Sequence, residues 1–356
     1  MKAARLHKIG SSLNIEEIAE PTLRPSGVIV RILKTFIPSF TAQVLSGELN
    51  YQVPPLPFTP GTSAIGIIET VADDVSSLER GQMVFCDQYI ASHNISTPPD
   101  AILMGWTGLA PASSHTQSLW KDGAMAQKAL FPAECLTPIT NTSISTELLA
   151  AIGYLAIPYG GFLRGNLRPS QVVIINGATG NLGTAAILVA LAMGASKVVA
   201  VGRNTTALSE LEKLDERRVV SVSLSGNTEE DAQKIKKAAG EADLVLDVLG
   251  GVTNPNLTLN CIRALRPKGT AVFMGGVKAD IPLPYAEIMI KEITISGAFM
   301  FPRQAPKDLL ELASAGILNL QAIQTHVYDL VDANKAVEAA SNMKGLDYCI
   351  LSPNNQ

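Results

Sequence analysis

The chain has 356 residues, of which 47% are hydrophobic and 17% charged, and its formal net charge is −4. This length suggests two domains, and the composition supports a large buried core and argues against disorder. No basic run or stripe of basic and aromatic residues is present, which argues against nucleic acid or an anionic membrane as the main partner. The four cysteines are far apart and form no C-x-x-C pair, so reduced thiols in the cytoplasm are the simplest interpretation.

The first part of the chain, residues 1–145, consists of short apolar segments between turns rich in proline and glycine. This pattern predicts an all-β, barrel-like domain. The proline-rich segment 54–61 predicts an extended loop. Residues 87–122 match no regular element, and both a lid over a binding pocket and a surface insertion are open for them. Strands are expected over residues 15–19, 27–33, 63–71, 82–86 and 122–131.

From Thr146 the pattern changes to alternating helices and strands. Strands are expected at 172–175, 197–201, 219–222, 243–248, 270–274 and 293–297, and helices at 147–154, 184–193, 205–214, 228–239 and 256–265. Six strands with crossover helices predict an α/β fold with a doubly wound parallel sheet over residues 146–300. The remaining segment, 301–356, has two helices and two strands and is a candidate to return to the first domain.

A glycine-rich turn lies at the start of this second part. Val172 to Ile175 are apolar and β-branched, which predicts a buried parallel strand. Gly177, Gly180 and Gly183 follow with the spacing G-x-x-G-x-x-G, and an apolar helical run comes next. A dinucleotide pyrophosphate needs this order, because glycines let the backbone approach and a helix N-terminus offers free N–H groups. The alternative, an Asn-Gly hairpin, fails because the residues after Gly183 lack alternation and are rich in Ala and Leu.

Arg203 lies 20 residues after Gly183, at the end of the second strand of the predicted sheet. An NAD-binding protein keeps an Asp or Glu at this point for the ribose 2′-hydroxyl, and here no acid occurs before Glu210. A guanidinium can instead bind a 2′-phosphate with two charge-assisted hydrogen bonds. The sequence therefore predicts NADPH as the cofactor, with a solvent-facing arginine at a helix start as the alternative.

Several short motifs, in this order and spacing, make the chain similar to the medium-chain dehydrogenases/reductases. They are the Met-Lys-Ala start, Phe58 to Gly66, Gly81 to Phe85, Asp122 to Ala126, Gly177 to Gly183, Pro267 to Thr270 and Gly345 to Pro353. The resemblance covers essentially the whole chain and is closest in style to the zinc-free, quinone oxidoreductase-like or enoyl reductase-like branch. It implies a GroES-like β-barrel catalytic domain from 1–145 and 301–356, a Rossmann domain at 146–300, and commonly a homodimer. Pairing of an edge strand, 292–297, across a two-fold axis would give such a dimer.

The resemblance also bears on metal binding. The zinc-dependent branch carries a Cys near the start of the first irregular segment and a Gly-His-Glu in the proline-rich turn. This chain has Ile37-Pro-Ser-Phe40 and Pro60-Gly-Thr-Ser63 in those places, without thiolate or imidazole donors. The four-cysteine structural zinc lobe is missing as well, so no metal is expected.

Further cofactor contacts are implied by the resemblance, since ligands of such sheets bind outside the carboxyl ends of the strands. Thr179, Asn181 and Leu182 are expected to offer backbone N–H groups to the pyrophosphate. Lys344, a cation near the last strand, is another candidate, and a plain surface lysine is its alternative. The strand-end contacts are expected from Asp247, Leu249, Gly275, Phe299 and Met300, although Leu249 could be simple core packing.

The expected chemistry is hydride transfer without a metal. A simple ketone would then need another group to polarise its oxygen, whereas a quinone or an enone spreads the charge over its conjugated system. Tyr51 lies in a loop where zinc-free relatives place a tyrosine, so it could donate a proton, or it could cover the core. Tyr159 is a second candidate, where the family chain approaches the nicotinamide. His93 and His115 could be acids or surface residues.

The expected substrate is a small aromatic or aliphatic molecule in an apolar cleft. Its wall is expected from Phe36, Phe40, Trp106, Phe299 and Met300, each of which could instead be core. NADPH-dependent reduction of a quinone or activated alkene is the favoured function. A metal-free carbonyl reductase or alcohol dehydrogenase, and an NADPH-binding protein with a structural or non-redox role, are the alternatives.

Overall fold

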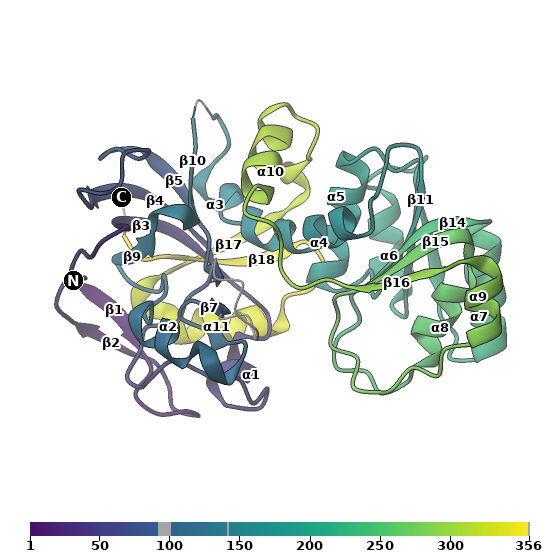
Figure 1. The fold of residues 1–356 in the computed structure, drawn as a ribbon, viewed down its shortest axis with the longest axis horizontal. Helices are drawn as coiled ribbons and strands as arrows, with labels where there is room; N and C mark the ends of the chain where they lie inside the picture. The colour runs from purple at the N-terminus through teal and green to yellow at the C-terminus, as the bar shows by residue number, and fades with distance from the viewer. Residues whose placement is uncertain (92–100, 141, 355–356) are drawn as a thin grey trace. The chain divides into compact units, whose positions relative to one another are not determined.

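The computed structural model describes residues 1–91, 101–140 and 142–354, and the chain divides into two compact units. Unit 1 comprises Met1–Gly153, Ile323–Met343 and Asp347–Gln356, and unit 2 comprises Tyr154–Ala322 and Lys344–Leu346. Unit 1 therefore contains both ends of the chain, as the colours of Figure 1 show. Compared with the limits expected from the sequence, the main difference is helix α10 (Ala305–Ser314), which groups with unit 2.

Unit 1 is built on a seven-stranded sheet with the order β10-β5-β4-β3-β18-β17, in which β9 also pairs with β3. These strands are β3 (Gly27–Ile37), β4 (Ala64–Val71), β5 (Met83–Cys86), β9 (Lys128–Pro132), β10 (Leu136–Pro138), β17 (Gln324–Asp329) and β18 (Asp347–Ser352). The Val- and Ile-rich strand β3 is largely buried and pairs antiparallel with β4, β9 and β18. The C-terminal strand thus completes a sheet begun near the N-terminus.

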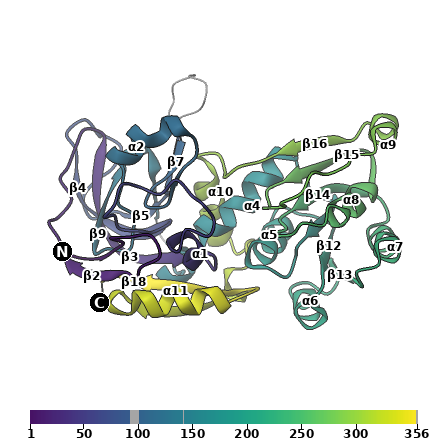
Figure 2. The ribbon, with the colours of Figure 1, turned by 90° about the horizontal axis from the view of Figure 1, so that it is seen from below.

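Smaller elements surround this sheet. They are β1 (Lys2–Arg5), β2 (Asn14–Glu17), β6 (Tyr89–Ala91), β7 (Ala101–Leu103), β8 (Thr107–Gly108), α1 (Thr41–Leu45), α2 (Ser114–Leu119), α3 (Thr146–Leu149) and α11 (Ala333–Asn342). Helix α11 packs along β18 (Figure 2). The segment 87–122, which matched no element in the sequence, contributes the three-stranded sheet β6-β7-β8 and helix α2. His93 lies outside the described residues.

A buried arginine fixes the proline-rich loop of unit 1. The Arg5 side chain is 11% exposed, and its Nη1 donates to the Asp122 carboxylate at 2.7 Å while its Nη2 donates to the Pro57 carbonyl at 2.8 Å. The same Asp122 oxygen accepts the backbone N–H of Thr59 at 2.7 Å. A charge-assisted network of this kind holds the loop that enters β4 in one conformation.

Unit 2 contains a six-stranded sheet in which every neighbouring pair is parallel, with the order β13-β12-β11-β14-β15-β16 (Figures 1 and 2). The strands are β11 (Val172–Asn176), β12 (Lys197–Gly202), β13 (Val219–Ser223), β14 (Ala242–Asp247), β15 (Leu265–Phe273) and β16 (Thr294–Gly297). The helices are α4 (Ile152–Arg164), α5 (Asn181–Ala192), α6 (Thr205–Glu212), α7 (Thr228–Ala239), α8 (Asn256–Arg263), α9 (Tyr285–Lys291) and α10. The predicted doubly wound sheet is confirmed.

Local sequence explains these elements. The central strands β11 and β12 are almost continuous runs of Val, Ile and Ala, and most of their side chains are fully buried, as in a sheet covered on both faces. Helix α7 is capped at its start by Asn227, whose side chain accepts two backbone N–H groups, and at its end by Gly240 with φ +69°.

Helix α4 is longer than the sequence predicts. A helix was expected to end at Tyr154, before Pro158, but α4 continues to Arg164 with Pro158 inside it. Tertiary packing compensates for the hydrogen bond that the proline removes. The apolar stretch 146–164 is long enough to cross a membrane, but 78% of it is buried inside the protein, which is typical of a core helix.

Candidate functional site

The glycine turn of unit 2 has the geometry expected of a phosphate loop. Gly177 has φ +92°, a conformation that side chains other than glycine rarely adopt. A Cβ at Gly183 would collide with the Gly177 carbonyl, so the turn and the helix can approach this closely only because residue 183 is glycine. Gly180, by contrast, has free space around it, since a Cβ there would meet only one atom, 3.7 Å away.

Helix α5 starts immediately after this turn, at Asn181. The N–H groups at the start of a helix have no carbonyl partner in a preceding turn, and the helix dipole makes this end attractive to anions. Thr179 lies in the glycine turn just before this helix end, and Leu182 lies in the first turn of the helix. The structure therefore provides at residues 177–183 an anion site suited to a pyrophosphate.

A short piece of the C-terminal chain is attached to the same helix. The Asn181 Nδ2 and the Thr184 hydroxyl both donate to the Gly345 carbonyl, at 3.0 and 2.6 Å. These bonds fix the neighbouring Lys344, which is exposed, beside the glycine turn. Its role as a phosphate contact stays a prediction, with which its exposure is compatible.

Arg203 follows β12 directly, and its side chain is exposed. It forms no hydrogen bond or ion pair with the part of the chain that the structure describes. The next residue, Asn204, caps helix α6 by accepting the Ala207 N–H at 3.0 Å. A Cβ at Gly202 would lie 2.9 Å from the Thr179 methyl group, so the glycine turn lies against the strand that carries Arg203.

Three strand ends meet at Leu249. The Leu249 carbonyl accepts the Gly276 N–H at 2.7 Å, and a Cβ at Gly275 would collide with that carbonyl. A Cβ at Gly177 would lie 3.2 Å from the Leu249 nitrogen. Asp247 is 2% exposed, and both of its carboxylate oxygens already accept hydrogen bonds from the protein.

Phe299 and Met300 follow β16. Phe299 is 61% exposed, whereas Met300 is only 8% exposed. Met300 has φ 54°, a left-handed conformation that is unfavourable for a residue with a side chain. A Cβ at Gly160 would collide with the Met300 carbonyl, so helix α4 packs directly on this turn.

The predicted catalytic and substrate residues of the β domain all lie in unit 1. Tyr51 is 38% exposed, and burial of the rest of the ring raises its pKa above 10.0. Phe40 is partly exposed and packs edge-on against Trp106, with ring centroids 6.0 Å apart. Trp106 and Phe36 are buried, at 2% and 3% exposure, and Phe36 packs on Tyr348. Only Phe40 and Tyr51 of this group present much surface to a small molecule.

Tyr159 and His115, the other candidate acids among the described residues, differ in their burial. Tyr159 lies inside α4, is 8% exposed, and its hydroxyl donates to the Asp308 carboxylate at 3.0 Å. Burial, together with that carboxylate, raises the pKa of Tyr159 to about 12. His115 is exposed on the short helix α2.

The positions that hold a catalytic zinc in the zinc-dependent branch contain hydroxyl and apolar side chains. Thr62 donates its hydroxyl to the Phe36 carbonyl at 2.5 Å and is 3% exposed. Burial raises the pKa of Cys86, Cys261 and Cys349, and none of these cysteines is part of a group of potential metal ligands among the described residues. Among the described residues, no group of three or more His, Cys, Asp or Glu is arranged to hold a metal ion. This donor set does not fit zinc.

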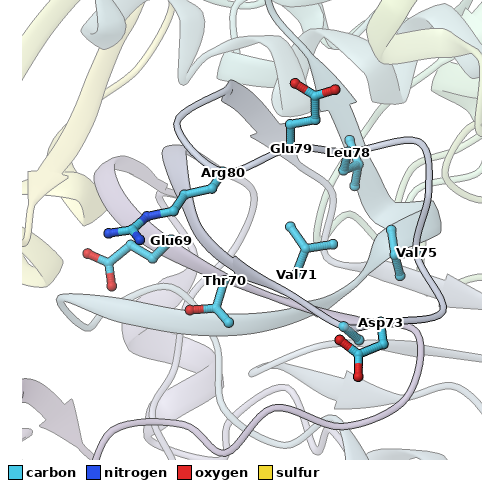
Figure 3. Close-up of a pocket in the computed structure, with 9 residues that line it drawn as sticks. Glu69, Thr70, Val71, Asp73, Val75, Leu78, Glu79 and Arg80 are labelled. Atoms are coloured by element: carbon cyan, nitrogen blue, oxygen red, sulfur yellow. The ribbon is translucent and has the colours of Figure 1, made fainter.

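One open pocket of about 500 Å³ lies elsewhere in unit 1, at the turn between β4 and β5 (Figure 3). Its lining mixes apolar residues, among them Val71, Val75 and Leu78, with charged residues such as Glu79 and Arg80. None of the predicted site residues lines this pocket.

Sequence reasoning missed several residues that support the site. Asn176 and Thr258 bind the Asp247 carboxylate, and Asp308 binds Tyr159. A signal existed for Asn176, because a polar side chain at the end of a buried apolar strand needs a partner. Thr258 and Asp308 become partners only through the fold, and no local pattern marks them.

Comparison with known proteins agrees with this architecture. Residues 24–141 match the model of the alcohol dehydrogenase GroES-like domain, and residues 181–315 match the model of the zinc-binding dehydrogenases. The chain is 27% identical over 318 residues to an alcohol dehydrogenase of Moraxella sp. (strain TAE123), with 89% of each chain covered. It is 25% identical over 372 residues to an NAD-dependent alcohol dehydrogenase of Sulfurisphaera tokodaii, covering 99% of this chain and all of that one.

Solved structures show the same fold. A putative zinc-binding dehydrogenase from Sinorhizobium meliloti 1021, bound to NADP, superposes with a TM-score of 0.80 over 99% of each chain at 20% identity. The GroES-like domain and the Rossmann sheet expected from the sequence are thereby confirmed. With the two family models covering the two domains in order, the chain belongs to the medium-chain dehydrogenase/reductase superfamily.

Proposed function

We propose that this protein is an NADPH-dependent oxidoreductase that transfers hydride to a quinone or an activated alkene without zinc. The observation that carries the cofactor assignment is the exposed, unpaired Arg203 at the end of β12, beside the glycine turn. The superfamily supports a nicotinamide cofactor in general, and the S. meliloti structure contains NADP. No carboxylate occurs between Arg203 and Glu210, where an NAD-binding protein would keep an acid for the ribose 2′-hydroxyl.

An arginine substitution tests this assignment. Arg203→Ala should weaken NADPH binding by about 10- to 100-fold, since a charge-assisted hydrogen-bond pair contributes about 1.5–3 kcal/mol. The NADH affinity should remain unchanged. Arg217→Ala is the matched control, because Arg217 is an exposed cation just before β13, at the amino end of the same sheet. An NADPH preference that survives Arg203→Ala would refute the assignment.

The substrate class follows from the donor set. When bound, the reduced nicotinamide would supply a hydride, and the acceptor would take one proton from the protein or from water. Thr62 and Ser63 replace zinc ligands, so no Lewis acid is available to polarise an isolated ketone. Tyr51 stays protonated at neutral pH and can donate a hydrogen bond to an enolate or quinol oxygen. Phe40 offers an apolar edge to the same small molecule.

A metal-free alcohol dehydrogenase or carbonyl reductase is the second candidate, because the curated relatives of similar length are named alcohol dehydrogenases. Loss of the reduced-nicotinamide absorbance with quinones, enones and ketones separates the two. We expect turnover of quinones or enones in metal-free buffer, and chelators should leave the rate unchanged. Turnover of ketones alone would favour the second candidate. Binding of NADPH without any turnover would point to a structural or non-redox role.

We also propose that two copies form a dimer through strand β16, in the reduced conditions of the cytoplasm. β16 is the edge of its sheet, and an unpaired edge can pair with its own copy across a two-fold axis. Large apolar side chains are exposed beside it: Leu283, Tyr285, Met289 and Ile290, with Tyr285 80% and Ile290 75% exposed. Ile290→Glu should convert a dimer measured by light scattering into a monomer. A monomeric wild-type protein would refute the proposal.

A further inference from the structure

A carboxylate is buried beneath the glycine turn without a cation. Asp247 ends strand β14 and is 2% exposed, and no described residue forms an ion pair with it. Burial raises its pKa, while three hydrogen-bond donors act in the opposite direction. An unpaired buried charge is costly, so stability alone gives little reason to keep it.

The three donors come from three different elements. Asn176 Nδ2, at the end of β11, donates to Oδ2 at 3.0 Å, and the Thr258 hydroxyl of α8 donates to the same oxygen at 2.5 Å. The backbone N–H of Leu249 donates to Oδ1 at 3.1 Å. Asn176 is the residue before Gly177, so the carboxylate connects the start of the glycine turn with the turn that follows β14.

The Leu249 turn has little freedom of its own. Its carbonyl accepts the Gly276 N–H, and glycines at 177 and 275 allow its backbone to lie between two neighbouring strand ends. A displacement of Leu249 would therefore move the surface at the carboxyl end of β11, β14 and β15 together. Ligands of parallel sheets bind at this end.

One polar atom beside the Asp247 carboxylate accepts no hydrogen bond from the described residues. Asn176 is fully buried, and its Oδ1 has no hydrogen-bond partner among the described residues. If the amide turned over, Oδ1 would face Asp247 and the two oxygens would repel each other. The orientation of Asn176 is thus set by the carboxylate.

We infer that Asp247 is a positioning residue, whose carboxylate sets Asn176 and Leu249 so that the two turns present one fixed surface to the dinucleotide. The inference rests on the proposed function. It differs from the expectation that Asp247 contacts the cofactor, because the carboxylate acts from inside the protein.

The test compares two aspartates of the same strand. Asp243, at the amino end of β14, also ties this strand to β11, because its carboxylate accepts the Val172 N–H at 2.7 Å. Asp247→Ala should raise the NADPH dissociation constant at least about ten-fold, because two turns lose their common acceptor. Asp243→Ala should lower the melting temperature and leave the dissociation constant within about three-fold.

Asp247→Asn separates positioning from direct contact. Asn176 can turn its free Oδ1 toward the new amide, and Thr258 can accept from it, so most of the affinity should return. A carboxylate that bound the cofactor itself would lose affinity in this variant as well. If Asp247→Ala does not fold, Thr258→Val and Thr258→Ser replace it, with weaker binding expected for Val only.

Wild-type binding is measured first, by the fluorescence of bound NADPH. If the wild type binds neither NADPH nor NADH, the proposed function fails, and the inference fails with it. If the wild type binds and Asp247→Ala keeps its affinity while its melting temperature falls, only the inference is overturned. Equal affinity losses in Asp243→Ala and Asp247→Ala would also overturn it.

Discussion

The Tyr159 hydroxyl donates a hydrogen bond to the Asp308 carboxylate at 3.0 Å, and this bond joins helix α4 to helix α10 inside unit 2. The second oxygen of Asp308 accepts from Gln304 at 3.0 Å. With its proton held by a carboxylate and its pKa raised to about 12, Tyr159 is a poor proton donor at neutral pH. Tyr51, which has no carboxylate partner among the residues that the structure describes, is the better candidate for catalysis.

Tyr159→Phe should therefore affect stability more than chemistry. The variant loses one hydrogen bond to a charged group, and we expect the free energy of unfolding to fall by about 1–2 kcal/mol. The turnover number should change by less than about three-fold. Urea denaturation and steady-state kinetics check the two expectations. A hundred-fold loss of turnover in a protein of unchanged stability would indicate that Tyr159 is a proton donor after all.

The pH dependence of this bond has a defined sign. The pKa of Tyr159 rises from 10.0 to about 12 on folding, so the folded state holds the proton more tightly than the unfolded state does. The contribution of this hydrogen bond to the free energy of unfolding is complete below pH 10 and is lost as the pH rises toward 12. The stability of the wild type should consequently decrease relative to Tyr159→Phe across this window. Thermal melts of both proteins from pH 9 to pH 12 measure the difference, and parallel curves would contradict it.

Tyr51→Phe, unlike Tyr159→Phe, should affect catalysis more than stability. Loss of a general acid typically lowers the turnover number by about 10²-fold. The melting temperature should hardly change, because Tyr51 is 38% exposed. In the wild type, activity should fall as the pH rises through the raised pKa of Tyr51, above 10.0, because the phenolate cannot donate a proton. An unaltered turnover number in Tyr51→Phe would leave solvent as the proton source.

The sequence could predict the elements that depend on local pattern. Strand β11, the glycine turn and helix α5 appear where expected, because apolar β-branched runs and glycine spacing are local signals. The path of residues 101–122 could not be predicted, since it depends on distant contacts such as the Gly108 N–H bond to the Gln52 carbonyl. The continuation of α4 through Pro158 also escaped, because packing outweighed a local helix-breaking signal. Likewise, Asp247 was visible as a strand-end acid, but its burial and its partners were not.

Two neighbouring glycines of α4 should respond differently to alanine. At Gly160 the new Cβ would collide with the Met300 carbonyl and the Phe301 backbone, whereas at Gly161 it would meet the flexible ends of Met274 and Leu246. Gly160→Ala should cost about 2 kcal/mol of stability, since backbone must move. Gly161→Ala should cost less than about 1 kcal/mol, because alanine also favours the helix. Denaturant titrations compare them, and equal losses would show that the Met300 turn yields easily.

The inserted segment 101–122 supports the Tyr51 loop, which gives it a testable role beyond those of a lid or a surface insertion. Gln117 is 2% exposed and donates its Nε2 to the Gln52 carbonyl at 2.6 Å, next to the bond from Gly108. Gln117→Leu removes this donor at similar volume, and misplacement of Tyr51 should lower the turnover number about ten-fold.

A double-mutant cycle shows whether the effect passes through Tyr51. In a Tyr51→Phe background, Gln117→Leu should cause no further loss, because the group that it positions is already absent. Ser118 is an exposed neighbour on α2 whose hydroxyl donates to the His115 carbonyl, so Ser118→Ala is the control and should behave as the wild type in both backgrounds. Equal losses from Gln117→Leu with and without the Tyr51 hydroxyl would mean that the insertion acts on another part of unit 1. Gln117→Asn should lower the turnover number much as Gln117→Leu does, since the shorter side chain cannot reach the Gln52 carbonyl.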